Sequence, residues 1–436
     1  MNQLERQTPP PSKSIAEFSL DAPVIEHLSN GIPVYTLFNK QLDLIHILIS
    51  IRAGILHERQ KHVAQFSYSL LKESSPVHSV TETADLLDFY GAHVSVSVML
   101  DRSTIFISVP AGNISKILPD IFAFLSHPQY KQDRLNIFKN LKIKDLEYNQ
   151  RKSDVRSTQL MLHAMFGDGL TAGQLSTRQN LQAVTIDQMY THHKETFCAE
   201  NLTLFLTGNI TPEISSCIFD LFSQIPNGPA SPVIRNLTIP ADPVRIISEA
   251  MPDSVQSSIS LCMAREGYLS AERREFSFLS TLTGGYFGSR LMQNLRERNG
   301  YTYGVSAGSV YFGNQSLFII NSDVNACHTQ AAIDACFEEL QRLQEELVGD
   351  EELESVRNYL LGDILRDVEN SVSYLKKLAF WTFFGLDEHE FPKMIQSIRN
   401  VHAETLTTLA KKLFHRNNFT QIIVGDIRNL KQLTIS

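Results

Sequence analysis

A short segment, LRERNGYTYG (295–304), places a guanidinium and two phenols around an Asn-Gly pair. Arg296, Tyr301 and Tyr303 all carry hydrogen-bond donors. The local pattern by itself predicts the end of a helix. Basic residues face the negative end of the helix dipole, and Gly300 accepts the left-handed conformation that follows the last turn. On local grounds, Arg296 is a solvated capping charge and Tyr303 packs its ring on a sheet.

The remaining candidates for chemistry form no recognisable site. In HERQKH (57–62) the two histidines are five positions apart, so a helix would point them in different directions. The adjacent His192 and His193 diverge for the same reason. The five cysteines form no CxxC pair, which predicts free thiols in a reducing compartment. No GxSxG elbow occurs, and the glycines of GGYFGSRL (284–291) lack the lysine of a phosphate-binding loop.

The elements that must position these residues alternate between strand and helix periodicity. A hairpin is predicted over 24–38, with Asn30-Gly31 at its turn. Further strands are predicted at 46–54, 94–100, 103–112, 201–208, 257–266, 302–311, 316–324 and 419–425. Helical periodicity covers 61–75, 80–92, 113–128, a long stretch at about 130–165, 270–283 and a segment ending near Asn299.

The sequence contains an internal duplication of one structural unit. NLTLFLTGNI (201–210) recurs as NFTQIIVGDI (418–427), and a single offset of 217 positions relates the two copies. SIRAG (50–54) resembles MAREG (263–267) at a similar offset. The offset of 217 holds for the pairs Lys194 and Lys411, Phe197 and Phe414, Asn201 and Asn418, Gly208 and Gly425, and Ile210 and Ile427.

The duplication predicts an α+β fold of two homologous tandem domains, each an antiparallel sheet with helices packed on it. We expect a disordered tail over 1–20, a first domain over 21–224 and a second over 246–436. The range 225–245 contains five prolines and is expected to be an extended, semi-rigid linker.

Composition excludes several classes of protein. The formal charge of −8 disfavours nucleic acid as the main partner, because phosphate binding needs clustered lysine and arginine. The apolar run LDLIHILISI (42–51) is too short to span a bilayer, and the N-terminus has no apolar core of a secretory signal. These features predict a cytoplasmic protein with no membrane and no nucleic acid among its partners.

Together, these segments resemble the insulinase/pitrilysin superfamily of zinc peptidases, and most closely its short two-domain branch, which includes the mitochondrial processing peptidase. The resemblance rests on the two halves, on SIRAG and NLTLFLTGNI, and on two C-terminal motifs. Those motifs are GGYFGSRLMQNLRERNGYTYGVSAG (284–308) and EELESVRNYLLG (351–362). The fold it implies is a pair of domains that forms half of a clamshell.

Active members of that family carry His-x-x-Glu-His on the first helix of the N-terminal half, and a distal Glu completes the zinc site. In HVAQFSYSLLKESS (62–75) the corresponding positions are Gln65, Tyr68 and Ser69, and Glu147 matches the distal ligand. Gln and Ser supply neutral oxygens that are poor zinc ligands beside imidazole and carboxylate. A phenol with an ordinary pKa near ~10 cannot replace a carboxylate base at neutral pH. We therefore expect no metal in this chain.

The resemblance implies that the C-terminal motif, unlike the zinc motif, keeps its functional residues. In the family an Arg and a Tyr of this motif bind the substrate backbone and the tetrahedral intermediate, and Arg296 and Tyr303 stand at the matching positions. The implied protein is the inactive subunit of a heterodimeric zinc metallopeptidase, not catalytic alone. It would supply both residues in trans to a homologous subunit that carries His-x-x-Glu-His and zinc. An unfolded peptide is the implied substrate.

Two alternatives remain at this point. A non-enzymatic peptide-binding or scaffold subunit would form a stable complex whose function survives loss of Arg296 and Tyr303. An enzyme with a relocated metal site would contain stoichiometric zinc after purification.

Overall fold

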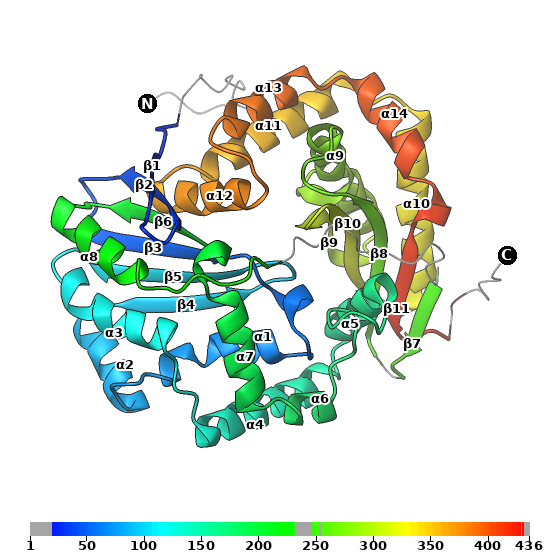
Figure 1. Ribbon diagram of the computed structural model, residues 1–436. Coiled ribbons are helices and arrows are strands. Elements are labelled where there is room, and N and C mark those ends of the chain that lie inside the picture. Colours follow the sequence, from blue (N-terminus) through cyan, green and yellow to red (C-terminus); the bar gives the residue numbers. More distant parts are fainter. Residues whose placement is uncertain (1–19, 232–245, 253, 429, 431–436) are drawn as a thin grey trace, which may run out of the picture.

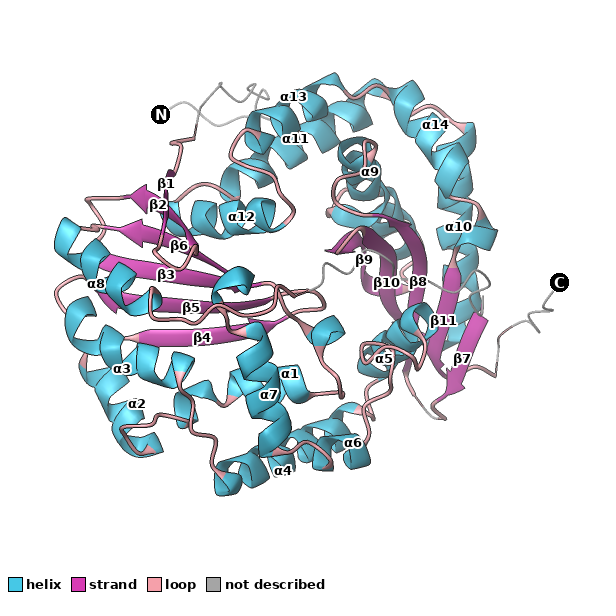
Figure 2. Ribbon diagram, viewed as in Figure 1, coloured by secondary structure: helices cyan, strands magenta, loops and turns pink. Residues whose placement is uncertain are grey.

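The computed structural model describes residues 20–231, 246–252, 254–428 and 430 (Figure 1). Within these ranges the chain forms one six-stranded and one five-stranded sheet, each flanked by helices (Figure 2). The predicted α+β class is confirmed. The tail and most of the predicted linker lie outside the described residues. No helix in the described part of the chain combines the length and apolar character needed to cross a membrane.

The first sheet has the order β1-β2-β6-β3-β5-β4. The predicted hairpin is present, and its turn uses Gly31 at a φ of 87°, a value that glycine adopts without strain. Central β3 is buried along nearly all of its length, as its apolar run requires. The strands are β1 (Val24–His27), β2 (Pro33–Phe38), β3 (Leu44–Ile51), β4 (His93–Val98), β5 (Ser103–Pro110) and β6 (Leu202–Gly208).

The second sheet repeats this order without a counterpart of β1: β7-β11-β8-β10-β9. β2 and β6 run parallel, and so do β7 and β11, while the other pairs are antiparallel. Each sheet is therefore mixed, because the long helical crossover before its last strand permits a parallel neighbour. The strands are β7 (Ile246–Ala250), β8 (Gln256–Glu266), β9 (Thr302–Phe312), β10 (Gln315–Asn325) and β11 (Thr420–Gly425).

Helices cover the sheets and connect them. Those of the first half are α1 (Val63–Ser69), α2 (Val80–Phe89), α3 (Ile114–Ser126), α4 (Gln132–Asn149), α5 (Ser153–Phe166), α6 (Arg178–Gln182), α7 (Ile186–Thr196) and α8 (Pro212–Phe222). Those of the second half are α9 (Arg273–Ser280), the π-helical segments η4 (Thr281–Gly285) and η5 (Met292–Arg298), α10 (Thr329–Glu345), α11 (Asp350–Arg366), α12 (Ser371–Phe383), α13 (Glu390–Asn400) and α14 (Ala403–Leu413).

The two halves exchange one helix each. α5, from the first half, packs on β8 and β11 of the second sheet, and α12, from the second half, packs on β3 and β6 of the first (Figure 1). The long helical stretch predicted at about 130–165 is present as two helices, α4 and α5. The chain breaks at Gln150–Lys152, where Lys152 has extended backbone angles, so that α5 can reach the other sheet.

The exchanged helix α5 is fixed by both polar and apolar contacts. Arg156 makes two hydrogen bonds of 2.7 Å with Glu249 of β7, and the hydroxyls of Ser157 and Ser260 lie 2.9 Å apart. Leu160 and Met161 join a buried cluster with side chains of β8 and β11. These contacts cross between the halves, so each half completes the packing of the other.

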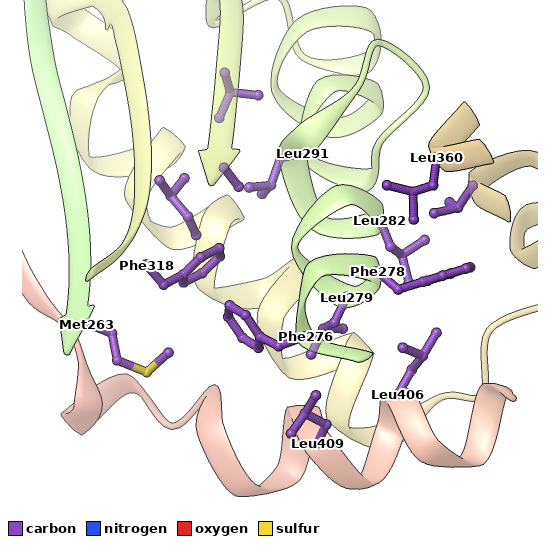
Figure 3. Close-up of a cluster of buried hydrophobic side chains, with 14 of the residues drawn as sticks. Met263, Phe276, Phe278, Leu279, Leu282, Leu291, Phe318, Leu360, Leu406 and Leu409 are labelled. Carbon is purple, nitrogen blue, oxygen red and sulfur yellow. The ribbon is translucent and has the colours of Figure 1, made fainter. Parts of the chain in front are cut away.

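The core of the second half is built around α9. Phe276 and Phe278 are fully buried, and the ring of Phe276 meets that of Phe318 on β10 at 5.0 Å (Figure 3). Leu406 and Leu409 of α14 close the cluster from below in the same view. This packing holds α9 between the sheet and the outer helices.

Candidate functional site

Helix α1, which carries the motif positions, is preceded by a residue with unusual backbone angles. His62 precedes it with a φ of 77°, in the left-handed region. The carboxylate of Glu58 accepts hydrogen bonds from the backbone N–H groups of His62 (3.1 Å) and Ala64 (2.9 Å), which satisfies donors of the first turn. Burial raises the pKa of Glu58 to about 7. A buried acidic side chain thus fixes the start of the motif helix.

Tyr68, which the family resemblance places at the position of the general base, belongs to the core. It is completely buried, and its hydroxyl lies 2.7 Å from the hydroxyl of Thr196 on α7. The rings of His192 and His193 pack around it at 5.9 and 6.4 Å. Burial raises the pKa of the phenol further above its ordinary value. This group stays neutral and cannot take a proton from water.

The other motif positions also fail to form a metal site. Gln65 and Ser69 are half-buried on α1. Glu147 lies on α4, which packs against α1 through the rings of Phe66 and Phe138, 4.9 Å apart. The carboxylate of Glu147 forms an ion pair with Arg178, and both side chains are more than half exposed.

The chemical types of these side chains determine whether they could hold a zinc ion. One carboxylate engaged with a guanidinium, one amide and one hydroxyl do not make a zinc site. No group of three or more His, Cys, Asp or Glu residues suited to a metal occurs in the described ranges. The residues present therefore do not fit the zinc that the family resemblance associates with these positions.

The Arg/Tyr motif of the second half has the helix end that the sequence predicts. Gly300 has a φ of 64°, and its N–H donates to the carbonyl of Arg296 (3.2 Å). The N–H of Tyr301 donates to the carbonyl of Leu295 (2.8 Å). The segment η5 is π-helical, a geometry that often occurs at functional sites and that the sequence did not predict.

The side chains of this motif reach the surface. Tyr303, the second residue of β9, is 88% exposed and does not pack on the sheet, contrary to the local interpretation. The guanidinium of Arg296 lies over the ring of Phe287 at 4.8 Å, and its Nε lies 3.4 Å from the carboxylate of Glu297. Tyr301 stacks on His328 at 4.8 Å and serves packing.

The two motifs sit in different halves. α1 packs on α7 and β4, whereas η5 packs on β9 and α10. A cavity of about 400 Å³ beside β9 is lined by Gly304, Ser306 and Asp323 and by Asp154 and Ser157 of α5. Sequence reasoning missed this cavity because α5 comes from the other half of the chain.

A second feature that sequence reasoning missed joins the halves directly. Arg102, in the turn between β4 and β5, lies with its guanidinium carbon 4.9–5.5 Å from three phenylalanine rings of the α12 region. Asp101 pairs with Arg102 (3.0 Å) and accepts a hydrogen bond from the N–H of Gly313 (2.8 Å), in the turn between β9 and β10. The rings are those of Phe380, Phe383 and Phe384.

Comparison with known proteins gives a consistent result. Residues 183–360 match the family model described as the peptidase M16 inactive domain. A protein of Rickettsia bellii named an uncharacterized zinc protease is 20% identical over 407 residues, which cover 92% of this chain and 97% of that protein. A protein of Bacillus subtilis with a similar name is 19% identical over 391 residues, covering 88% and 94%.

Solved structures share the fold over nearly the whole chain. The structure of a peptidase M16 inactive domain from Pseudomonas fluorescens has a TM-score of 0.85 at 18% identity, covering 93% of this chain and 98% of that one. A protease from Helicobacter pylori has a TM-score of 0.81 at 15% identity, covering 92% and 99%.

Proposed function

We propose that this chain is the metal-free subunit of a heterodimeric zinc peptidase. The match of residues 183–360 to the peptidase M16 inactive domain and the resemblance to the insulinase/pitrilysin superfamily support the peptidase-like part of the proposal. The partner of this chain is a homologous subunit with an intact His-x-x-Glu-His helix. The two subunits close around an unfolded peptide. This chain supplies Arg296 and Tyr303 to the reaction at the partner's metal.

The contrast between the two motifs carries the proposal. Tyr68 is buried in the core and hydrogen-bonded, so this side chain is not available to activate water. Tyr303 is 88% exposed and Arg296 is over one-third exposed. The guanidinium and phenol groups are hydrogen-bond donors, and donors at a surface are available to a second molecule.

The chemistry follows from the donor types. When bound in the partner, zinc supplies a Lewis acid and an activated water. The Arg296 guanidinium donates to the peptide carbonyl oxygen and favours the charge that develops there. The Tyr303 hydroxyl adds a second donor. Preorganised donors of this kind are worth ~10²–10³ in rate each.

The test is purification from the native host followed by peptidase assays on the recovered pair. We expect a homologue with His-x-x-Glu-His in equal amount. Arg296→Ala is expected to lower kcat about 10²–10³-fold, and Tyr303→Phe to lower it by a smaller factor, without loss of the complex. Arg298→Ala is the matched control, because this exposed arginine lies in the same turn.

Three outcomes oppose the proposal. Full peptidase activity of this chain alone in metal-free buffer would end it. Stoichiometric zinc in the purified chain would point to a relocated metal site. A stable complex whose function survives loss of both Arg296 and Tyr303 would identify a scaffold subunit instead.

A further inference from the structure

A cavity of about 650 Å³ lies between the two halves. α9, α11 and β9 of the second half form its floor and walls. The turn between β4 and β5 of the first half covers it, and α12 and α13 complete it. A concave site of this size at a junction between domains is within the range of ligand-binding pockets.

Its position has a counterpart in the first half. α9 is the first α-helix after central strand β8, as α1 is after β3. α11 precedes the exchanged helix α12, as α4 precedes α5. β9 is the outer strand next to β10, as β4 is next to β5. The cavity therefore occupies, in the second half, the place that corresponds to the degenerate motif in the first half.

The charges around the cavity neutralise one another. Arg273 and Arg274 both pair with the buried carboxylate of Glu390, and the Arg274 contact is 2.8 Å. Lys377 pairs with Asp367 at 2.6 Å. With Arg102 held by Asp101, the cations at the wall have partners within the protein. A charged ligand would have to displace one of these pairs, which disfavours it.

The part of the cavity that a ligand can contact without displacing an ion pair is mainly apolar. Met99 and Leu100 of the first half and the second-half residues Val310, Leu360 and Ile364 all line the cavity. Val310 is 46% exposed although it is apolar. Burying apolar surface here is the main gain that a bound molecule can make.

The outer strand indicates which apolar molecule fits. Ser309, Val310 and Tyr311 of β9 line the cavity, and among the described strands β9 pairs only with β10. Backbone groups on an open strand edge bind an extended chain by strand addition. A lipid or hydrocarbon would leave these groups unused, whereas a peptide satisfies them and places side chains in the cavity.

We propose that this cavity is a specificity pocket for a large apolar side chain, aromatic or branched aliphatic, of an extended peptide. The inference deepens the proposed function by naming the class of peptide, and it rests on that function for peptide being the ligand. It does not depend on the partner or on zinc, because all of the pocket belongs to this chain.

The test uses the purified full chain and a pair of fluorescent, unstructured peptides that differ only at one central residue, Phe in one and Ser in the other. Fluorescence anisotropy gives both dissociation constants. We expect the Phe peptide to bind about tenfold more tightly or better, as burial of one such side chain implies. Equal binding of the two peptides would overturn the proposal.

Two variants locate the binding. Val310→Asp puts a charge at the mouth of the pocket, and Ser277→Phe fills the pocket from an exposed position on α9. Both are expected to remove most of the preference for Phe and to leave the weaker Ser peptide unchanged. Val77→Asp is the control, because Val77 is 67% exposed in the first half, away from the residues that line the pocket.

Folding of each variant is checked independently. Trp381 is the only tryptophan of the chain and is fully buried in α12, so its emission reports an intact core. If folded Val310→Asp and Ser277→Phe retain the preference, the pocket proposal fails while the heterodimer proposal stands. If the preference is seen but no homologous subunit accompanies the chain, the heterodimer proposal fails alone.

Discussion

α1 and α9 are topologically equivalent helices, yet they present different surfaces. α1 is capped by buried Glu58 and turns Tyr68 into the core against α7. α9 starts at half-buried Glu272, continues into the π-helical segment η4, and faces the cavity between the halves. The duplicated unit has thus kept one topology while one helix became a packing element and the other a cavity wall.

Position 68 shows how a side chain of this kind is accommodated on α1. A phenol at the position of Tyr68 fills core volume and satisfies its hydroxyl with Thr196. A carboxylate at the same buried position would need a metal or an ion-pair partner. Without such a partner, this position favours an uncharged side chain that packs, as Tyr68 does.

The largest expected effect comes from placing a carboxyl group at position 68. Tyr68→Glu should lower the free energy of unfolding by roughly 3–4 kcal/mol, because it buries a carboxyl without a cationic partner. Tyr68→Phe, the control, loses only the hydrogen bond with Thr196 and should cost about 1 kcal/mol. Denaturation in guanidinium measures both. Equal stability of the two variants would show that the position is not a core position.

The contact between the halves gives the next largest effect. Arg102→Ala removes the guanidinium from the three phenylalanines and leaves the buried carboxylate of Asp101 unpaired, at a cost of roughly 2–3 kcal/mol. Asp101→Asn/Arg102→Ala should recover part of this loss, because no charge is then left unpaired. If the double variant is less stable than Arg102→Ala, the buried charge is not the reason.

The stability that Glu58 contributes at the start of α1 depends on pH. Its folded pKa of about 7 lies above the ordinary 4.5, so the folded chain holds this proton in a range where the unfolded chain has released it. The stability that Glu58 contributes is full below a pH of about 4.5 and is lost as the pH rises to about 7.

Glu58→Gln removes this titration and therefore serves as the reference. Between about pH 5 and pH 8 the stability of the wild type should fall relative to Glu58→Gln by roughly 2 kcal/mol. Urea titrations of both proteins at each pH measure the difference. A constant difference across this range would show that the Glu58 carboxyl is not perturbed by its burial.

The smallest effect is expected at Glu147. Glu147→Gln breaks an exposed ion pair with Arg178 and should change the free energy of unfolding by less than ~1 kcal/mol. Arg178→Gln is the matched control and should behave alike. Metal analysis of wild type and Glu147→Gln completes the test, since a loss of bound zinc in the variant would make Glu147 a ligand after all.

Much of the fold could be predicted from local pattern. The Asn30-Gly31 hairpin, the strand pairs on both sides of the duplication and the glycine-capped turn at Gly300 all follow from residues near one another in sequence. The break between α4 and α5 could not be predicted, because both flanks are helical and only the distant second sheet requires the chain to turn at Lys152.

The candidate site also has features that the sequence predicts and features that it does not. The residue types at 65, 68 and 69 by themselves exclude an ordinary zinc site, since ligand chemistry is a property of the side chain. The burial of Tyr68 against α7, the contact of Arg102 with the phenylalanines of α12 and the cavity beside Val310 depend on segments far apart in the chain. Sequence determined the repeated unit and the side-chain types at positions 65, 68 and 69. Tertiary structure decided which equivalent surfaces became core and which stayed open, because burial arises from contacts between segments far apart in the chain.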